Sequence, residues 1–198
     1  VDTEQGVAYG PGASRVEALI READLVVNLG WLNRLPIEQR SDRPDVYIDL
    51  DPVYTQIKLV SGDSPLPTAL DGHPYLFTFG ENIGTPRSPV PTGGYTWHAT
   101  RQPVVLELWA GVGCPGRAYT TVGKWNSQGR DLTYQGETFH WSKRMEWLRC
   151  LHLPAQTAAA FEVAMNVDSV AGDPELLAAH GWGVVDPLAV STDPWRYR

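Results

Sequence analysis

The hydrophobic residues of the chain fall into short apolar runs, separated by polar stretches rich in glycine and proline. Five runs between residues 24 and 125 have the length and β-branched character of strands: DLVVNLG (24–30), DVYIDLD (45–51), YLFTFGENIG (75–84), PVVLELW (103–109) and AYTTVGKW (118–125). Most are continuously apolar rather than alternating, which is typical of strands covered on both faces. The pattern therefore predicts an α/β fold.

Helical spacing occurs between some of these runs. Residues 14–23, SRVEALIREA, place their apolar positions on one helical face, and Ser14 with Glu17 has the spacing of a capping box. The stretch PVYTQIKL (52–59) predicts a helix that follows the second strand.

The last third of the chain alternates most clearly. It predicts strand, helix, strand, helix, strand and helix in turn: 118–125, 142–151, 161–167, a helix capped by Asp173 with Pro174 in its first turn, 182–186, and a helix opened by Asp193 and Pro194. This order is the parallel, right-handed βαβ pattern. The intervening stretch 126–141 predicts a β-hairpin, and the glycine-rich stretch 111–117 is the candidate boundary between two lobes, 1–113 and 114–198.

Composition narrows the classes of function. Lys and Arg number 16 against 23 Asp and Glu, a net charge of −7 without any basic run, so nucleic acid is not an expected partner. No segment has the apolar length of a membrane span, and the N-terminus lacks the pattern of a signal peptide. Two distant cysteines, Cys114 and Cys150, are expected to be idle or buried thiols of a cytoplasmic protein.

The small and polar residues gather after the predicted strands, where open parallel sheets bind ligands. Gly30 and Trp31 follow the first strand, and Glu81 and Asn82 follow the third; these four are candidate cleft residues. Gly123, Lys124 and Trp125 end the fifth strand. Loops are polar in any protein, so the pattern alone leaves an ordinary solvated edge as the alternative.

Asp49 and Asp51 are the candidate catalytic residues. Their spacing places both side chains on the same side of a strand, where one carboxylate can serve as a general base or two can hold a metal. The alternative is that Asp51 caps the helix at 52–59. The histidines lack zinc-site spacing and FGENIG lacks the P-loop ending, so neither a metal nor another cofactor is predicted.

The chain contains eight tryptophans, and most are expected to pack in the core or between lobes. Trp31 and Trp125 lie near predicted strand ends and are candidates for stacking on a sugar or base.

The last third resembles a known family. TTVGKW, a helix opening near Lys143, and then FEVAMNV, DPELLAAHGW and GVVDP resemble the first half of the nucleotide-sugar-binding domain of GT-B glycosyltransferases. More loosely, YIDLDP, GENIGTPRSPVPTGG and TRQPVVLELW are similar to stretches of uncharacterised bacterial proteins labelled glycosyltransferase.

This resemblance implies two Rossmann-like lobes facing each other across a cleft. Residues 1–113 would form the acceptor side, and 114–198 the first half of the donor lobe. In many members an arginine after the first strand of the donor lobe and a lysine near its first helix bind the donor diphosphate. Lys124 and Lys143 stand at those positions, with Gly123 and Trp125 beside the first.

The chain also departs from the family pattern. Lysine replaces arginine at 124, the insert 126–141 separates the two cations, and the chain ends about halfway through the expected lobe, which would leave that lobe incomplete.

The expected function is transfer of a sugar from a nucleotide-diphosphate donor to a small-molecule or glycan acceptor, without a metal. Cations placed where the leaving diphosphate gains charge lower the barrier, and an inverting reaction would use Asp49 or Asp51 as base. The alternatives are a non-catalytic binding or scaffold protein of the same fold and an unrelated α/β protein.

Overall fold

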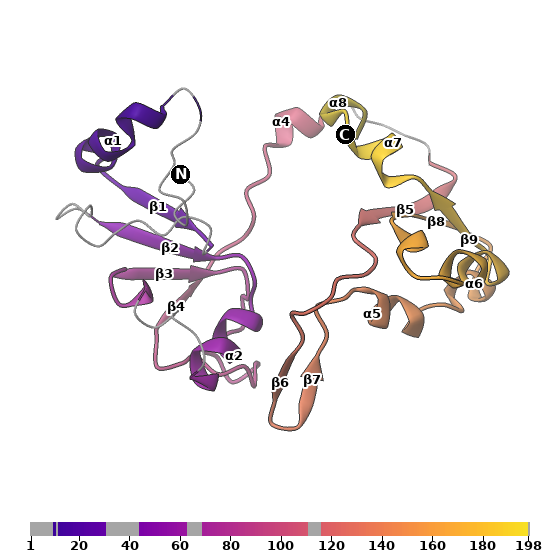
Figure 1. Ribbon diagram of the computed structural model, residues 1–198, viewed down its shortest axis with the longest axis horizontal. Coiled ribbons are helices and arrows are strands. Elements are labelled where there is room, and N and C mark those ends of the chain that lie inside the picture. The colour runs from indigo at the N-terminus through magenta and orange to yellow at the C-terminus, as the bar shows by residue number, and fades with distance from the viewer. Residues whose placement is uncertain (1–9, 11, 31–43, 63–68, 111–115, 198) are drawn as a thin grey trace. The chain divides into compact units, whose positions relative to one another are not determined.

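The computed structural model describes residues 10, 12–30, 44–62, 69–110 and 116–197 (Figure 1). The chain forms two compact units, Val1–Pro103 and Val104–Arg198. The boundary predicted after residue 113 lies outside the described residues, as do Cys114 and Trp31.

The first unit contains a four-stranded sheet in which all the strands are parallel. Its strands are β1 (Val26–Leu29), β2 (Asp45–Asp49), β3 (Tyr75–Thr78) and β4 (Trp97–Ala99), in the spatial order β1-β2-β3-β4. The predicted strands at 24–30, 45–51 and 75–84 are therefore confirmed. Each strand therefore lies next to the strand that follows it in the sequence.

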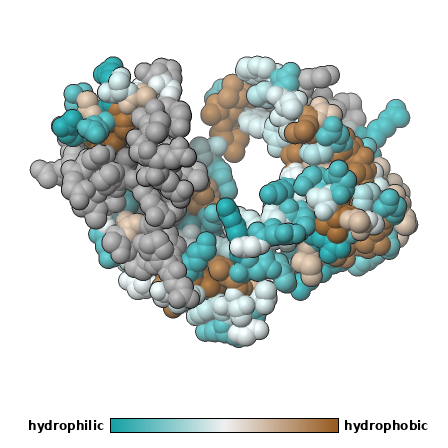
Figure 2. Space-filling model, viewed as in Figure 1, coloured by the Kyte–Doolittle hydropathy of each residue, from teal (hydrophilic) through white to brown (hydrophobic). Residues whose placement is uncertain are grey.

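The fourth predicted strand is wrong. Residues 103–109 contain a short helix, α4 (Leu106–Trp109), with Leu106 72% and Trp109 48% exposed, and Figure 2 shows apolar atoms at its surface. The strand that completes the sheet is instead β4, whose only buried side chain is that of Trp97. A three-residue edge strand with one buried side chain leaves almost no hydrophobic pattern to recognise.

One face of this sheet forms the core of the first unit. Tyr47, Leu76 and Trp97 occupy matching positions on three adjacent strands and are 2%, 5% and 9% exposed. Leu59, from the helix α2 (Tyr54–Ser61), packs against them. Asp49 lies two residues beyond Tyr47 and so shares this buried face.

The N-terminal helix is confirmed in position but not in its cap. A 3₁₀ turn, η1 (Ala13–Arg15), leads into α1 (Val16–Glu22), and neither element has a side-chain cap. The expected capping box of Ser14 and Glu17 is wrong, because Ser14 lies inside the 3₁₀ turn rather than at the N-cap position.

The second unit contains a three-stranded parallel sheet and a hairpin. The sheet has the order β5 (Ala118–Gly123), β8 (Ala160–Met165), β9 (Trp182–Val185), and the hairpin pairs β6 (Leu132–Tyr134) with β7 (Glu137–Phe139). Its α-helices after β5 are α5 (Arg144–Arg149), α6 (Asp173–Ala179), α7 (Pro187–Ser191) and α8 (Pro194–Tyr197), with 3₁₀ turns η3 (Leu153–Gln156) and η4 (Val167–Ser169). All the elements predicted in this region are confirmed, whereas α7 was missed.

The short helix α7 carries the same signal as α8, an Asp-Pro pair. The Asp186 carboxylate accepts from the Leu188 backbone N–H at 2.9 Å, which is an N-cap bond. Asp193 makes the equivalent bond to the backbone N–H of Trp195, also at 2.9 Å.

The two faces of the small sheet differ. One face carries the core of the unit, in which Val163 and Trp182 pack with Trp125 and with Leu177 of α6. The other face presents Thr120, Val122, Glu162 and Ala164 and is contacted by α7. The fold class is therefore mixed α/β with parallel sheets of four and three strands. Within the described residues no helix is both long and apolar enough to cross a bilayer.

Candidate functional site

The start of α5 is tied to the end of β5 by backbone contacts. The Arg144 N–H donates to the Trp125 carbonyl at 3.0 Å, and the Ser142 hydroxyl donates to the same oxygen at 3.3 Å. The insert 126–141 therefore leaves the sheet and returns to nearly the same point, as Figure 1 shows for the hairpin β6–β7. The two lysines that flank the insert are brought to one edge of the sheet in this way.

Lys143 is the N-cap residue of α5, and its side chain reaches back over β5. A Cβ placed on Gly123 would lie 3.7 Å from the Lys143 ammonium and 3.6 Å from the methyl carbon of Met165. The ammonium group therefore lies over the backbone at the carboxyl end of the strand. A Cβ at 123 would touch the ammonium group at an ordinary contact distance, so a longer side chain there would compete with Lys143 for this space.

Lys124 follows Gly123 directly and is exposed, as is Lys143. Among the described residues neither ammonium group forms an ion pair, although the chain as a whole is acidic. The structure thus brings Gly123, Lys124 and Lys143 together as an unneutralised cationic edge. An anion could approach this edge without displacing a carboxylate.

Trp125 does not take the role that its position suggested. Its side chain is 0% exposed, so the expected stacking on a sugar or base is wrong for this residue. Its backbone N–H donates to the Asn166 side-chain oxygen at 3.0 Å, and its indole N–H donates to Asp173 at 2.7 Å. Trp125 therefore holds the end of β5 in the core and positions its neighbour Lys124.

Asp173 is the second partner in this arrangement. Arg144 donates to both of its carboxylate oxygens, at 2.5 and 2.9 Å, and the Asp173 side chain is 4% exposed. The hydrogen bond from Arg144, with that from Trp125, holds the pKa of Asp173 below its ordinary value despite its burial. The expected capping role of Asp173 is wrong: Gly172 is the N-cap residue of α6, without a side-chain cap, and the carboxylate turns into the core instead.

In the first unit Asp49 occupies the end of β2 as a fully buried carboxylate, 0% exposed. One oxygen accepts from the Thr55 hydroxyl at 2.6 Å and the Asp51 backbone N–H at 3.1 Å. The other accepts from the Gln56 amide and the Thr78 hydroxyl, both at 2.9 Å. Asp49 thereby joins β2, β3 and α2, and it could act as a base only by giving up one of these four bonds.

Asp51 is exposed, which suits a group that meets solvent or an acceptor. The alternative, that it caps α2, is wrong. The N-cap residue is Val53, at φ 77°, and no side-chain cap is present; the Val53 N–H instead donates to the Gln56 side chain at 2.7 Å. Asp51 supports this turn through its backbone: its carbonyl accepts from the Thr55 N–H at 3.1 Å, and its N–H donates to Asp49.

The candidate cleft residues of the first unit have local roles. Gly30 is buried at φ 63°, and its N–H donates to the Ile48 carbonyl at 2.8 Å, which extends the pairing of β1 with β2. Glu81 forms a bidentate ion pair with Arg101, and that hydrogen-bonded guanidinium lowers the pKa of Glu81. Asn82 is exposed, and its carbonyl accepts from Thr85.

Sequence reasoning missed the residues that position these groups, namely Thr55, Gln56, Thr78, Arg144, Asn166 and Asp173. The Thr-Gln pair after Asp51 had a usable signal, because polar residues on the inner face of a predicted helix require buried partners. The partners of Asn166 and Arg144 lie 41 and 29 residues away and had no local signal.

The described part of the chain contains no group of three or more His, Cys, Asp or Glu side chains able to hold a metal ion. In comparisons with known proteins, no family model, curated protein or solved structure matches the chain.

Proposed function

We propose that this chain binds a nucleoside-diphosphate sugar and transfers its sugar, in the manner of a GT-B-like glycosyltransferase. The second unit would serve the donor and the first unit the acceptor, each as a Rossmann-like lobe. The single observation that supports this most is the placement of the Lys143 ammonium over Gly123, next to Lys124, without a carboxylate partner among the described residues.

The chemistry of the leaving group explains why such an edge would matter. A nucleoside diphosphate gains negative charge as the glycosidic bond breaks, and cations already in place stabilise that charge without reorganisation. Two lysines at the carboxyl end of a parallel strand occupy the region where open α/β sheets bind ligands. Lysine can supply this charge as a point cation in place of a metal.

In the first unit Asp51 is better placed than Asp49 to be the acceptor base. Asp51 is exposed, whereas both oxygens of Asp49 already accept hydrogen bonds. A base must come within hydrogen-bond reach of the acceptor hydroxyl. Asp49 would then hold the loop that presents Asp51, since it accepts the Asp51 backbone N–H.

The second candidate function is nucleotide-sugar binding without catalysis. The observation that favours it is again Asp49, because a carboxylate held by four hydrogen bonds serves structure rather than proton transfer. The two candidates share the lysine edge and differ only in turnover.

Calorimetric titration of UDP, GDP and dTDP into the chain tests the shared part. Lys124→Ala or Lys143→Ala removes one charge-assisted contact, so diphosphate affinity should fall roughly 10- to 150-fold. The effect should shrink at high salt, because the lysines are exposed.

Lys58→Ala is the matched control, because Lys58 lies in α2 of the first unit and should leave binding unchanged. Equal losses in all three variants, or no loss in any, would refute the diphosphate site. Turnover of labelled nucleotide sugars then separates the two candidates: a wild type that binds donor but neither transfers nor hydrolyses it is a binding protein.

A further inference from the structure

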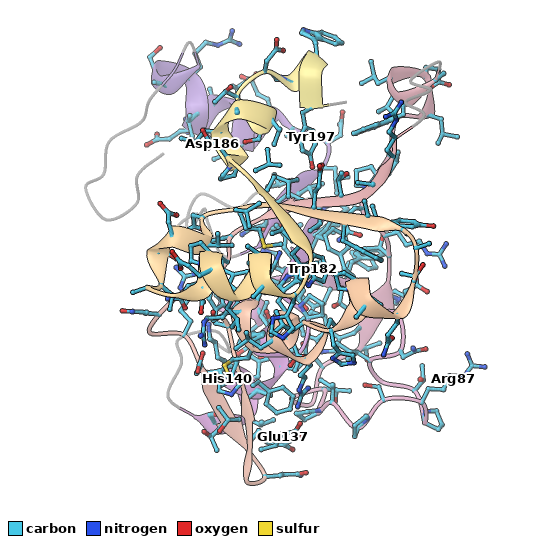
Figure 3. All side chains as sticks on the ribbon, turned by 90° about the vertical axis from the view of Figure 1, so that its right-hand side faces the viewer. Arg87, Glu137, His140, Trp182, Asp186 and Tyr197 are labelled. Carbon is cyan, nitrogen blue, oxygen red and sulfur yellow. The ribbon has the colours of Figure 1, made fainter. Side chains whose placement is uncertain are left out.

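A cavity of about 480 Å³ lies on the other face of the β5–β8–β9 sheet, away from the Trp125 core. Its walls come from six elements, including Thr120 of β5, Glu162 of β8, Val185 of β9 and Val190 of α7. Its size falls within the range of small-molecule sites, roughly 300–1,000 Å³. Figure 3 shows Tyr197, a lining residue from α8, on the opposite side of the sheet from the core residue Trp182.

Glu162 is the one charged residue among those that line this cavity in the described part of the chain. Its side chain leans across the neighbouring strand, since a Cβ added to Gly183 would lie 2.9 Å from the Glu162 Cγ. The absence of a side chain at 183 is therefore what lets Glu162 lie along the sheet. Among the described side chains no cation forms an ion pair with it.

The remaining lining suits an apolar body next to a positive charge. Val185, Val190 and Ala164 supply aliphatic surface, and Trp109 and Tyr197 present rings that are 48% and 50% exposed. Aromatic faces attract cations, and the Glu162 carboxylate, which is exposed, attracts them by its charge. A cation would form an ion pair with this carboxylate, a neutral ligand would gain no such charge interaction, and an anion would be repelled by it.

We propose that this cavity binds a small organic ammonium ion with an apolar body, its charge against Glu162 and its hydrocarbon against the valines and aromatic rings. The site is separate from the lysine edge: it lies on the face of Glu162 and Ala164, whereas Gly123, beneath the Lys143 ammonium, shares the opposite face with Val163 and Met165. It has the opposite charge and does not depend on the proposed glycosyl transfer.

The test uses three probes of matched shape and different charge: benzylammonium, benzyl alcohol and benzoate. Each is titrated into the 198-residue chain, and binding is followed by calorimetry and by chemical-shift changes. Benzylammonium should bind at least about 10-fold more tightly than the alcohol, as expected for one charge-assisted contact, and benzoate should not bind.

Glu162→Gln keeps the shape of the side chain and removes its charge, so the preference for the ammonium ion over the alcohol should disappear. Glu137→Gln, on the exposed hairpin strand β7, is the matched control and should bind like wild type. Tyr197→Leu should weaken binding of the ammonium ion more than binding of the alcohol, because the substitution removes an aromatic ring but keeps an apolar side chain.

Equal affinity for ammonium and alcohol, an unchanged preference in Glu162→Gln, or the absence of binding by all three probes would each overturn the proposal. The lysine variants distinguish the two sites: Lys143→Ala should leave benzylammonium binding unchanged even where it abolishes diphosphate binding.

Discussion

In each unit a buried carboxylate joins several segments of the chain. Asp49 in the first unit and Asp173 in the second are 0% and 3% exposed, and each accepts hydrogen bonds from more than one segment of the chain. A buried carboxylate is tolerated only when its oxygens are satisfied, so each of these residues makes stability depend on its partners.

Asp49→Asn should destabilise the first unit. The amide NH₂ that replaces one oxygen would face two donors that the carboxylate now accepts, either Thr55 and Asp51 or Gln56 and Thr78. We expect the free energy of unfolding to fall by roughly 2–3 kcal/mol, measured by urea denaturation. Asp51→Asn, at an exposed site in the same loop, should change it by less than about 0.5 kcal/mol. Equal stabilities of these variants would contradict the hydrogen-bonding role of Asp49.

Arg144→Met should destabilise the second unit by about 3 kcal/mol, because it leaves the buried Asp173 carboxylate without its cation. The matched control is Arg149→Met, since Arg149 pairs with Glu146 on the exposed side of the same helix. A loss of similar size in both variants would show that helix α5, rather than the buried pair, is the sensitive feature.

The Asp173 pair also predicts a pH dependence. Its pKa is held below the ordinary value near 3.8, first by Arg144, so the unfolded chain binds more protons than the folded one in the interval between the two pKa values. The stabilisation is therefore fully present above the unfolded pKa and is lost as pH falls through the folded pKa. When the free energy of unfolding of the second unit is measured between pH 5 and 2, it should fall more steeply in wild type than in Arg144→Met. The difference between the two should be about the stabilisation that the ion pair of Asp173 provides. An equally steep loss of stability with falling pH in both proteins would contradict this role of the Asp173 pair.

At the scale of elements, the turn of the hairpin β6–β7 has a backbone conformation that its residues do not favour. Tyr134 pairs with Glu137, so the loop consists of Gln135 and Gly136, and both have positive φ, 51° and 82°. This is the backbone of a type I′ turn, which favours Asn-Gly over Gln-Gly. The hairpin thus carries a strained residue at its tip.

Gln135→Asn should relieve that strain, because asparagine adopts left-handed backbone conformations more readily than glutamine. We expect the free energy of unfolding of the second unit to rise by up to about 1 kcal/mol, and its melting temperature to rise accordingly. Gln128→Asn, at an exposed position outside the left-handed region, should not stabilise the protein. A gain of the same size at 128 would mean that the turn is not the cause.

At the scale of the whole molecule, the division at Pro103 and Val104 predicts that the two units unfold separately. Equilibrium denaturation should show two transitions. Asp49→Asn should shift only one of them, Arg144→Met only the other, and the double variant should show the sum of the two effects. A single transition shifted by both substitutions would show that the units unfold as one.

The hydrophobic pattern by itself determined the α/β class and most of the elements: β1, β2, β3, β5, β8 and β9, with α2, α5, α6, α8 and the hairpin. These follow from periodicity, chain-breaking residues and Asp-Pro pairs, which act over a few neighbouring positions. The sequence also placed the lysines at a strand end and a helix start, where the structure has them.

Only the tertiary structure determined which of the polar and aromatic residues near the strand ends are buried and which are exposed. Asp49, Asp51, Trp125 and Asp173 all stand in similar polar contexts along the sequence, yet Asp51 meets solvent while the others are buried. What separates the three aspartates is whether a donor from a distant segment, such as Thr78 for Asp49 or Arg144 for Asp173, lies opposite the side chain; Trp125 is itself such a donor, to Asp173. The local sequence pattern does not predict such long-range pairs, because a polar group is buried only where tertiary packing places a hydrogen-bond partner beside it.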